Sequence, residues 1–191
     1  KVFLGTLWNM LCFILMTVPA LAVIGLGLAL ALNRTTRTAA FLRGVFFSSS
    51  VLSVTIVTLL WRIVFIPDGG FLTNVLGMFG HPPIPFLSSE NLALPAIAIT
   101  TIWWCLGLPM MLFLAALQQV PRELYEAAAL DNAGRWKTLW NVTLPSIQRT
   151  LVLVIVYEIV LQFQLFGQSQ LMTLGGPNNA SRSTVLFIYE V

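Results

Sequence analysis

An uncharged stretch runs from Val2 to Asn33 and determines the class of fold that this chain can adopt. Within it, residues 7–32 exceed the roughly 20 apolar residues that a helix needs to cross a bilayer. The whole chain is 58% hydrophobic and 9% charged, whereas an ordinary soluble domain carries about 25% charged residues. A soluble fold of 191 residues could not bury this much apolar surface. Since backbone amides in lipid must be paired within their own segment, the sequence predicts an all-α, polytopic membrane protein.

The predicted membrane spans belong to a single transmembrane domain that covers residues 1–191. The spans comprise residues about 7–32, 44–66, 92–117 and 150–171. We expect one further helix beyond each end, because no signal peptide precedes residue 7 and residues 184–189 begin another apolar segment.

The basic residues predict how the spans are oriented. Seven of the ten Lys and Arg side chains fall in residues 33–43 and 118–149. The positive-inside rule places both loops in the cytoplasm. The loop of residues 67–91 contains no Lys or Arg and is predicted to lie on the outer side. Because this orientation accounts for the net charge of +3, we expect no nucleic acid as a partner.

The cytoplasmic loop of residues 118–149 predicts two short helices. Pro121 suits the first turn of a helix, and residues 126–129 give that helix a small, smooth face. A break at residues 132–134 follows, and Trp136 and Trp140 then line one face of a second helix. Two large indoles on a polar loop need a partner or the lipid headgroups. Periodicity alone is equally compatible with a hairpin that lies on the membrane interface.

The order of residue types in this loop resembles a known signature. Glu126-Ala127-Ala128, three residues, Asn132, nine residues, Val142, one residue and Leu144-Pro145 follow one another. This run is similar to the signature loop of binding-protein-dependent ABC importer permeases, which has Gly where this chain has Asn132 and Ile where it has Val142. Asn tolerates the left-handed conformation, so a tight turn at position 132 is retained. The resemblance extends over almost the whole chain. It implies a permease-type bundle of six or more helices, whose first and last are missing here.

The resemblance also implies roles and partners. In that family the loop seats in a groove of a cytoplasmic ATPase. The residues implied in coupling are Glu126, Ala127, Ala128 and Asp131 as contacts, Asn132 and Gly134 at the turn, and Leu144 and Pro145, which set the second helix against the membrane. The implied partners are two ABC ATPases that bind ATP and Mg, a second and distinct permease subunit, an extracytoplasmic solute-binding protein and the lipid of a prokaryotic inner membrane.

Three further segments resemble the carbohydrate branch of the family. They are Leu117–Tyr125, Gly70–Leu76 and the run Thr173-Leu-Gly-Gly-Pro-Asn. The resemblance implies import of a di- or oligosaccharide, or of a related polyol or glycerol phosphate. A non-sugar solute stays an alternative. Residues 48–50 are all Ser where many relatives carry Leu-Pro, which leaves the bend of the span 44–66 open.

The span of residues 150–171 is unusually polar. Glu158 lies near its midpoint, where a carboxylate costs several kcal/mol unless it is paired, hydrated or protonated. At 100° per residue, Glu158 and Gln162 share one helix face. We hypothesise that both line the substrate path and hydrogen-bond sugar hydroxyls. Pairing of Glu158 with a partner subunit, or proton coupling in a secondary transporter, are the alternatives.

Residues for catalysis or cofactor binding are not evident in the sequence. The lysines are Lys1 and Lys137, and neither follows a phosphate-binding Gly-x-x-x-x-Gly loop. His81 is the only histidine, and Cys12 and Cys105 fall inside apolar spans. We therefore expect no catalytic residue, metal or cofactor of its own in this chain. A membrane scaffold without transport activity would explain neither the signature loop nor the polar span.

Overall fold

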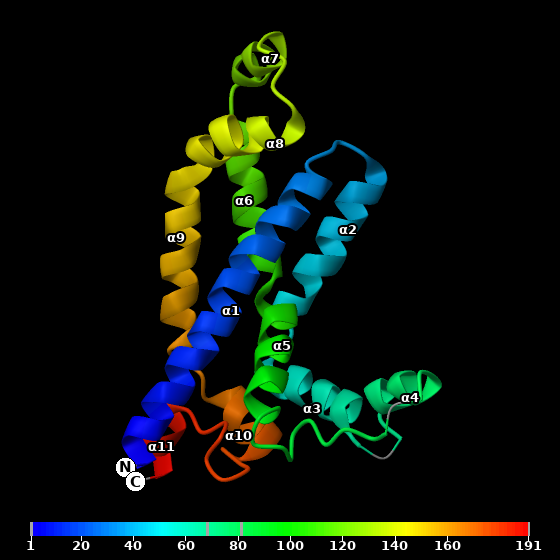
Figure 1. Cartoon of the computed structure of the whole chain (residues 1–191), viewed down its shortest axis with the longest axis vertical. Coiled ribbons are helices and arrows are strands. Elements are labelled where there is room, and N and C mark those ends of the chain that lie inside the picture. The colour runs from blue at the N-terminus through cyan, green and yellow to red at the C-terminus, as the bar shows by residue number, and fades with distance from the viewer. Residues whose placement is uncertain (1, 68, 81, 191) are drawn as a thin grey trace. The chain divides into compact units, whose positions relative to one another are not determined.

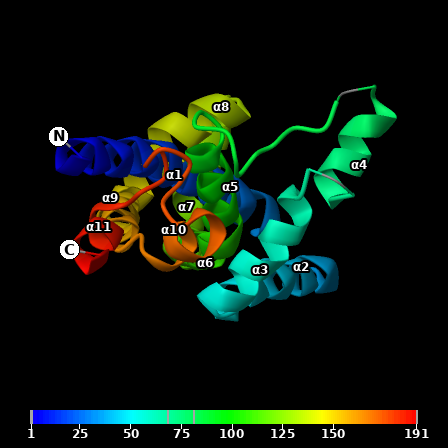
Figure 2. The same ribbon diagram turned by 90° about the horizontal axis from the view of Figure 1, so that it is seen from below.

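The computed structural model describes residues 2–67, 69–80 and 82–190. His81, which the sequence places in an outer loop, lies outside these residues. All regular elements of the described chain are helices (Figures 1 and 2), which confirms the all-α prediction. They are α1 (Val2–Leu32), α2 (Arg37–Ser48), η1 (Ser49–Val51), α3 (Val54–Phe65), α4 (Phe71–Met78), α5 (Ala93–Cys105), α6 (Gly107–Gln119), α7 (Arg122–Leu130), α8 (Arg135–Thr138), η2 (Leu139–Thr143), α9 (Leu144–Gln162), α10 (Gly167–Thr173) and α11 (Thr184–Glu190).

Two helices of the described residues are long and apolar enough to cross a membrane alone. They are α1 and the continuous helix of residues 135–162, which α8, η2 and α9 form together. Two further pairs, α2–η1 with α3 and α5 with α6, pass the same test as bent spans, each bent by more than 40°. Up to four spans therefore fit the described chain, and the predicted boundaries differ from the helix ends at several points.

The predicted span of residues 44–66 is broken at its serines. Ser48 and Ser49 donate their hydroxyl groups to the carbonyls of Val45 and Phe46, at 2.7 and 3.0 Å. Such bonds compete with the helical ladder, and α2 ends here in a 3-10 turn. The Ser53 side chain then accepts a hydrogen bond from the Ile56 amide, and Ser53 is the N-cap of α3.

The other predicted spans also change at identifiable residues. Pro109 has no N–H for the carbonyl of Cys105, and α5 ends at Cys105. The predicted span of residues 150–171 starts earlier, at Leu144, and its helix ends at Gln162; residues 163–166 then separate it from the short α10.

Two compact units make up the chain, where the sequence predicts a single domain. The first contains Lys1–Pro19, Val51–Trp104 and Ile159–Val191, and the second contains Ala20–Ser50 and Cys105–Glu158. The core of the first unit packs Phe13, Phe65, Ile97, Leu165 and Met172 together, from helices α1, α3, α5 and α10 and the segment before α10. In this unit α10 approaches α3 so closely that a Cβ on Gly167 would lie 2.8 Å from the Val54 side chain.

The core of the second unit joins α1, α6 and α9. Its buried side chains are Ala29, Phe113, Leu114, Leu117, Ile147 and Val154. Gly107 lets α6 approach α2, since a Cβ there would lie 2.8 Å from the Phe47 Cα. At the turn between α1 and α2, the Arg43 guanidinium donates to the carbonyls of Leu32 and Arg34. A cation at this place satisfies the carbonyls at the end of α1 and complements its dipole.

Large apolar side chains remain exposed along the helices of both units. Leu15 and Val23 on α1 and Val152, Val156 and Val160 on α9 are exposed. The three valines recur every four residues and therefore form one stripe on α9. An apolar stripe of this kind belongs against lipid or another subunit rather than water.

Candidate functional site

The signature loop lies in the second unit, where α7 extends beyond the end of α6 (Figure 1). Pro121 precedes α7 as its N-cap, and Glu123 stands in the first turn, where an acidic group complements the helix dipole. The helix runs to Leu130. The elements of the loop thus fall at the positions that its proline and its small residues predict.

Asn132 ends α7 in a Schellman motif. Its φ is 51°, in the left-handed region that a turn at this position requires. The amide of Ala133 donates to the carbonyl of Ala128 at 2.9 Å, and the amide of Asn132 donates to that of Ala129 at 3.1 Å. These are the two bonds that close a Schellman motif. Asn is next to Gly in its tolerance of this conformation, so the departure from Gly leaves the turn intact.

The predicted contact residues of α7 differ in accessibility. Glu126, Ala127 and Asp131 are exposed, whereas Ala128 is only 8% exposed. Ala128 is thus less accessible than its neighbours on α7, and its role as a contact residue stays a prediction. Gly134 is exposed and is the N-cap of α8, with φ −65°, which other residues also adopt.

The second half of the loop continues into a membrane helix. Proline lacks a backbone N–H and disfavours a helix interior, yet the helix continues through Pro145. The amide of Leu144 donates to the carbonyl of Leu139, which makes residues 139–143 a π-helical turn. Figure 1 shows α8 and α9 running in different directions on either side of this turn. The wider turn accommodates Pro145, and α9 begins at the half-buried Leu144.

The two halves of the loop are joined by hydroxyl groups. Thr143 Oγ1 lies 3.4 Å from the Tyr125 hydroxyl on α7 and 3.4 Å from the Thr138 carbonyl. Trp136 and Trp140 remain 75% and 64% exposed. The loop is thus internally connected, and its exposed indoles form a surface that needs a partner or lipid headgroups.

Glu158 and Gln162 lie one turn apart on α9, as their spacing predicts. They are 1% and 3% exposed, and each takes part in an interaction in this structure. A buried carboxylate at this depth is costly in lipid and is retained where it has a function or a partner. Burial alone does not show whether these two side chains contact substrate, so their place in the substrate path stays a prediction.

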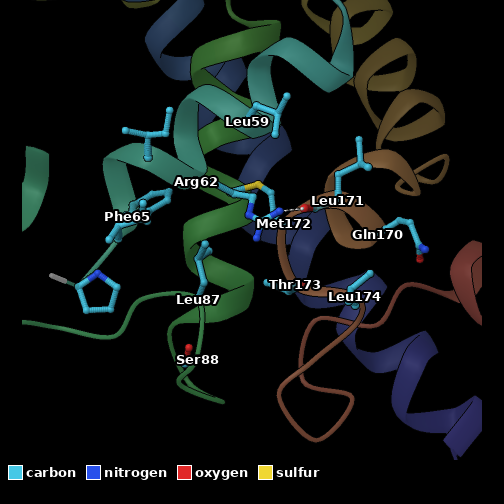
Figure 3. Close-up of a pocket in the computed structure, with 13 residues that line it drawn as sticks. Leu59, Arg62, Phe65, Leu87, Ser88, Gln170, Leu171, Met172, Thr173 and Leu174 are labelled. Carbon is cyan, nitrogen blue, oxygen red and sulfur yellow. Dashed lines mark hydrogen bonds between the residues drawn. The ribbon is translucent and has the colours of Figure 1, made fainter. Parts of the chain in front are cut away.

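An open cavity of about 840 Å³ lies in the first unit between α3 and α10 (Figure 3). Arg62 lines it and donates through Nη1 to the carbonyl of Leu171 at 3.4 Å, drawn as a dashed line in Figure 3. Leu174 lies at its rim with φ 53°, a conformation that costs a bulky residue about 1–2 kcal/mol. No sequence pattern indicates this cavity, because it forms between segments far apart in the chain.

Comparison with known proteins identifies the family. The family of binding-protein-dependent transport system inner membrane components matches residues 1–177. The chain belongs to this family. As a member with up to four candidate spans, it is a multi-pass protein of the inner membrane.

Individual members of the family are clearly similar to the chain. It is 31% identical over 189 residues to the sulfoquinovosyl glycerol transport system permease protein SmoG of Agrobacterium fabrum, covering 99% of this chain and 61% of SmoG. It is 33% identical over 168 residues to the multiple sugar-binding transport system permease protein MsmF of Streptococcus mutans, covering 88% of this chain and 58% of MsmF. The chain thus spans about three fifths of the length of these two relatives.

A solved structure shows the same fold. The crystal structure of a bacterial alginate ABC transporter, in complex with a periplasmic protein bound to an alginate pentasaccharide, contains a chain that matches with a TM-score of 0.85. The match covers 100% of this chain and 67% of the other at 22% identity. This likeness confirms the predicted all-α permease fold.

Proposed function

We propose that this chain is a transmembrane permease subunit of an ATP-driven importer of sugars. The cargo class would be di- or oligosaccharides, or related polyols or glycerol phosphates. Permease proteins named for sulfoquinovosyl glycerol, for multiple sugars and for trehalose and maltose are 31%, 33% and 27% identical to it. These names support a sugar cargo over a non-sugar solute, and they give no support to a proton-coupled transporter that uses Glu158.

The conformation of the signature loop carries this proposal. The Schellman motif at Asn132 closes the last turn of α7, and Glu126, Ala127 and Asp131 are exposed where an ATPase subunit could contact them. The Tyr125–Thr143 contact connects α7 to η2, which is continuous with α9. A displacement of α7 would therefore reach a membrane helix through a connected path within the second unit.

The partners would supply the energy and the substrate. Two cytoplasmic ABC ATPases would bind ATP and Mg, so the chain itself would be a transport subunit rather than an enzyme. Closure of the ATPases would draw the docked loops together and shift the population of the permease between inward-open and outward-open states. A second, distinct permease subunit would complete the pathway. A solute-binding protein would dock on the outer side, where residues 67–91 are predicted to lie.

The test is ATP hydrolysis by the full-length protein, co-purified with its ATPase, second permease subunit and binding protein in lipid. Glu126→Arg reverses a charge on the exposed face of α7. We expect loaded binding protein to stimulate ATP hydrolysis at least about tenfold less in this variant than in the parent. A tenfold loss corresponds to about 1.4 kcal/mol of coupling free energy. Leu124→Arg is the control, because Leu124 is exposed on the same helix, outside the signature and about 200° around the axis from Glu126. Equal stimulation in the parent and in Glu126→Arg would refute the coupling role.

A further inference from the structure

A second cavity, of about 680 Å³, lies in the first unit beside the first half of α1. It is formed by α1, by the last residues before α5 and the first turn of α5, and by the loop between α10 and α11. Its polar and aromatic lining consists of Trp8, Asn9, Glu90, Asn91, Asn178 and Asn179. The volume falls in the range of about 300–1,000 Å³ that is typical of small-molecule sites.

Hydrogen bonds hold the polar wall in place. Asn178 Nδ2 donates to Glu90 Oε1 at 3.1 Å, which joins the loop to the start of α5. Asn9 Nδ2 donates to the carbonyl of Asn179 at 2.8 Å, which joins the same loop to α1. Asn178 and Asn179 have φ of 49° and 63°, so both adopt the left-handed conformation. Asn tolerates this conformation better than other residues apart from Gly, so the loop can turn at both positions.

Trp8 adds an aromatic side chain to the lining. Trp8 is 66% exposed although it lines the cavity, so its indole offers a broad apolar face beside amide and carboxylate groups. A sugar ring has apolar C–H faces and a rim of hydroxyl groups. Trp can stack on such a face, while Asn side chains both donate and accept and a carboxylate accepts hydrogen bonds from hydroxyl groups.

The charge of the lining favours a neutral sugar over the phosphate of a lipid headgroup. Glu90 contributes a carboxylate, and the lining residues that the structure describes include neither Lys nor Arg. A phosphate group would be repelled by Glu90, and no Lys or Arg of the described lining would pair with it. The positive-inside rule places this end of α1 on the outer side, because its other end leads into the basic residues 33–43.

We propose that this cavity is an outer subsite for a neutral sugar or polyol, with the ring stacked on Trp8 and the hydroxyl groups bonded by Glu90 and the asparagines. This subsite rests on the proposed function, because its ligand would be the cargo or a unit of it. It is separate from the positions of Glu158 and Gln162, which lie outside the lining of this cavity.

The experiment measures sugar binding directly, without binding protein. The full-length transporter in lipid nanodiscs would be titrated with maltose, trehalose and glycerol, and saturation-transfer NMR would report contact and affinity. We expect at least one probe to bind, and to bind about tenfold more weakly in Trp8→Ala and in Glu90→Gln. Leu4→Ala is the matched control, since Leu4 is exposed on the same helix outside the lining, and it should bind like the parent.

Three outcomes would overturn the proposal. The first is that no probe binds to the parent, and the second is that Trp8→Ala binds like the parent. The third is that Trp8→Ala loses the second permease subunit on purification, which would make the surface a subunit contact. ATP-dependent uptake by the parent in proteoliposomes, measured separately with binding protein present, tests the proposed function. Uptake without direct binding would therefore refute the subsite alone.

Discussion

Glu158 and Gln162 raise the sharpest question at the level of single residues. Each is almost completely buried on α9, and each has a partner interaction in the structure. A carboxylate and an amide so placed can hold helices together or can be exposed to substrate when the permease changes state. A carboxylate and an amide can both hydrogen-bond sugar hydroxyl groups. A role in substrate binding and a role in holding helices together would differ in their effect on transport kinetics.

Glu158→Gln and Gln162→Ala therefore separate the two roles. If both side chains bind substrate, each substitution should raise the KM of sugar uptake roughly tenfold, because a lost hydrogen bond to a charged group is worth about 1.5–3 kcal/mol and one to a neutral group somewhat less. Uptake into proteoliposomes by the complete transporter provides the measurement. Gln148→Ala, at an exposed position of the same helix, is the control. An unchanged KM, or a loss of folded protein alone, would assign both residues a structural role.

At the level of elements, the end of α7 decides whether the coupling surface is ordered. Two backbone bonds close the Schellman motif, and Asn132 supplies its left-handed residue. Because a β-branched residue in this conformation costs more than Asn or Gly, the stability of the turn depends on this side chain.

Substitutions at Asn132 should follow that order. Asn132→Gly should leave the turn intact, whereas Asn132→Val should destabilise it by about 1–2 kcal/mol, the cost of left-handed backbone. Hydrogen exchange of the peptide that contains Ala133 should then become roughly 10-fold faster in Asn132→Val and stay unchanged in Asn132→Gly. Equal exchange in both variants would show that the motif does not control the order of the loop.

Sequence patterns within single segments predicted α1 and the turn at Asn132. The features that these patterns missed depend on contacts between residues far apart in the chain. The uncharged stretch predicted α1, and the tolerance of Asn for left-handed backbone predicted the turn at 132. The break after η1 could not be read from the serines alone, because the Leu52 carbonyl that it exposes is satisfied by the Trp104 indole at 3.0 Å. Helical spacing also fails beyond Gln162, where α9 ends.

The sites show the same limit. The small residues predicted the face of α7, but the burial of Ala128 beside the exposed Ala127 and Ala129 could not be read from them. The cavity beside Trp8 was also missed, because Trp8, Glu90 and Asn178 are brought together only by the fold. A run of asparagines at 178–179 after Gly-Gly-Pro was the one local signal that could have pointed to it.

At the level of the whole molecule, the chain has the fold of a permease and belongs to the family of binding-protein-dependent transport system inner membrane components. The chain spans about three fifths of the length of SmoG and of MsmF, and its partners and cargo are part of the proposal. In the proposed cycle, ATP hydrolysis by partner subunits drives the movement of sugar, and a proton gradient acting on Glu158 does not.

Uptake of labelled sugar into proteoliposomes tests this proposal most directly. The complete transporter would be reconstituted with loaded binding protein outside, with ATP or a non-hydrolysable analogue inside, and with or without a proton ionophore. We predict accumulation that requires hydrolysable ATP and persists when the ionophore collapses the proton gradient. Accumulation that proceeds without ATP and disappears with the ionophore would contradict the account.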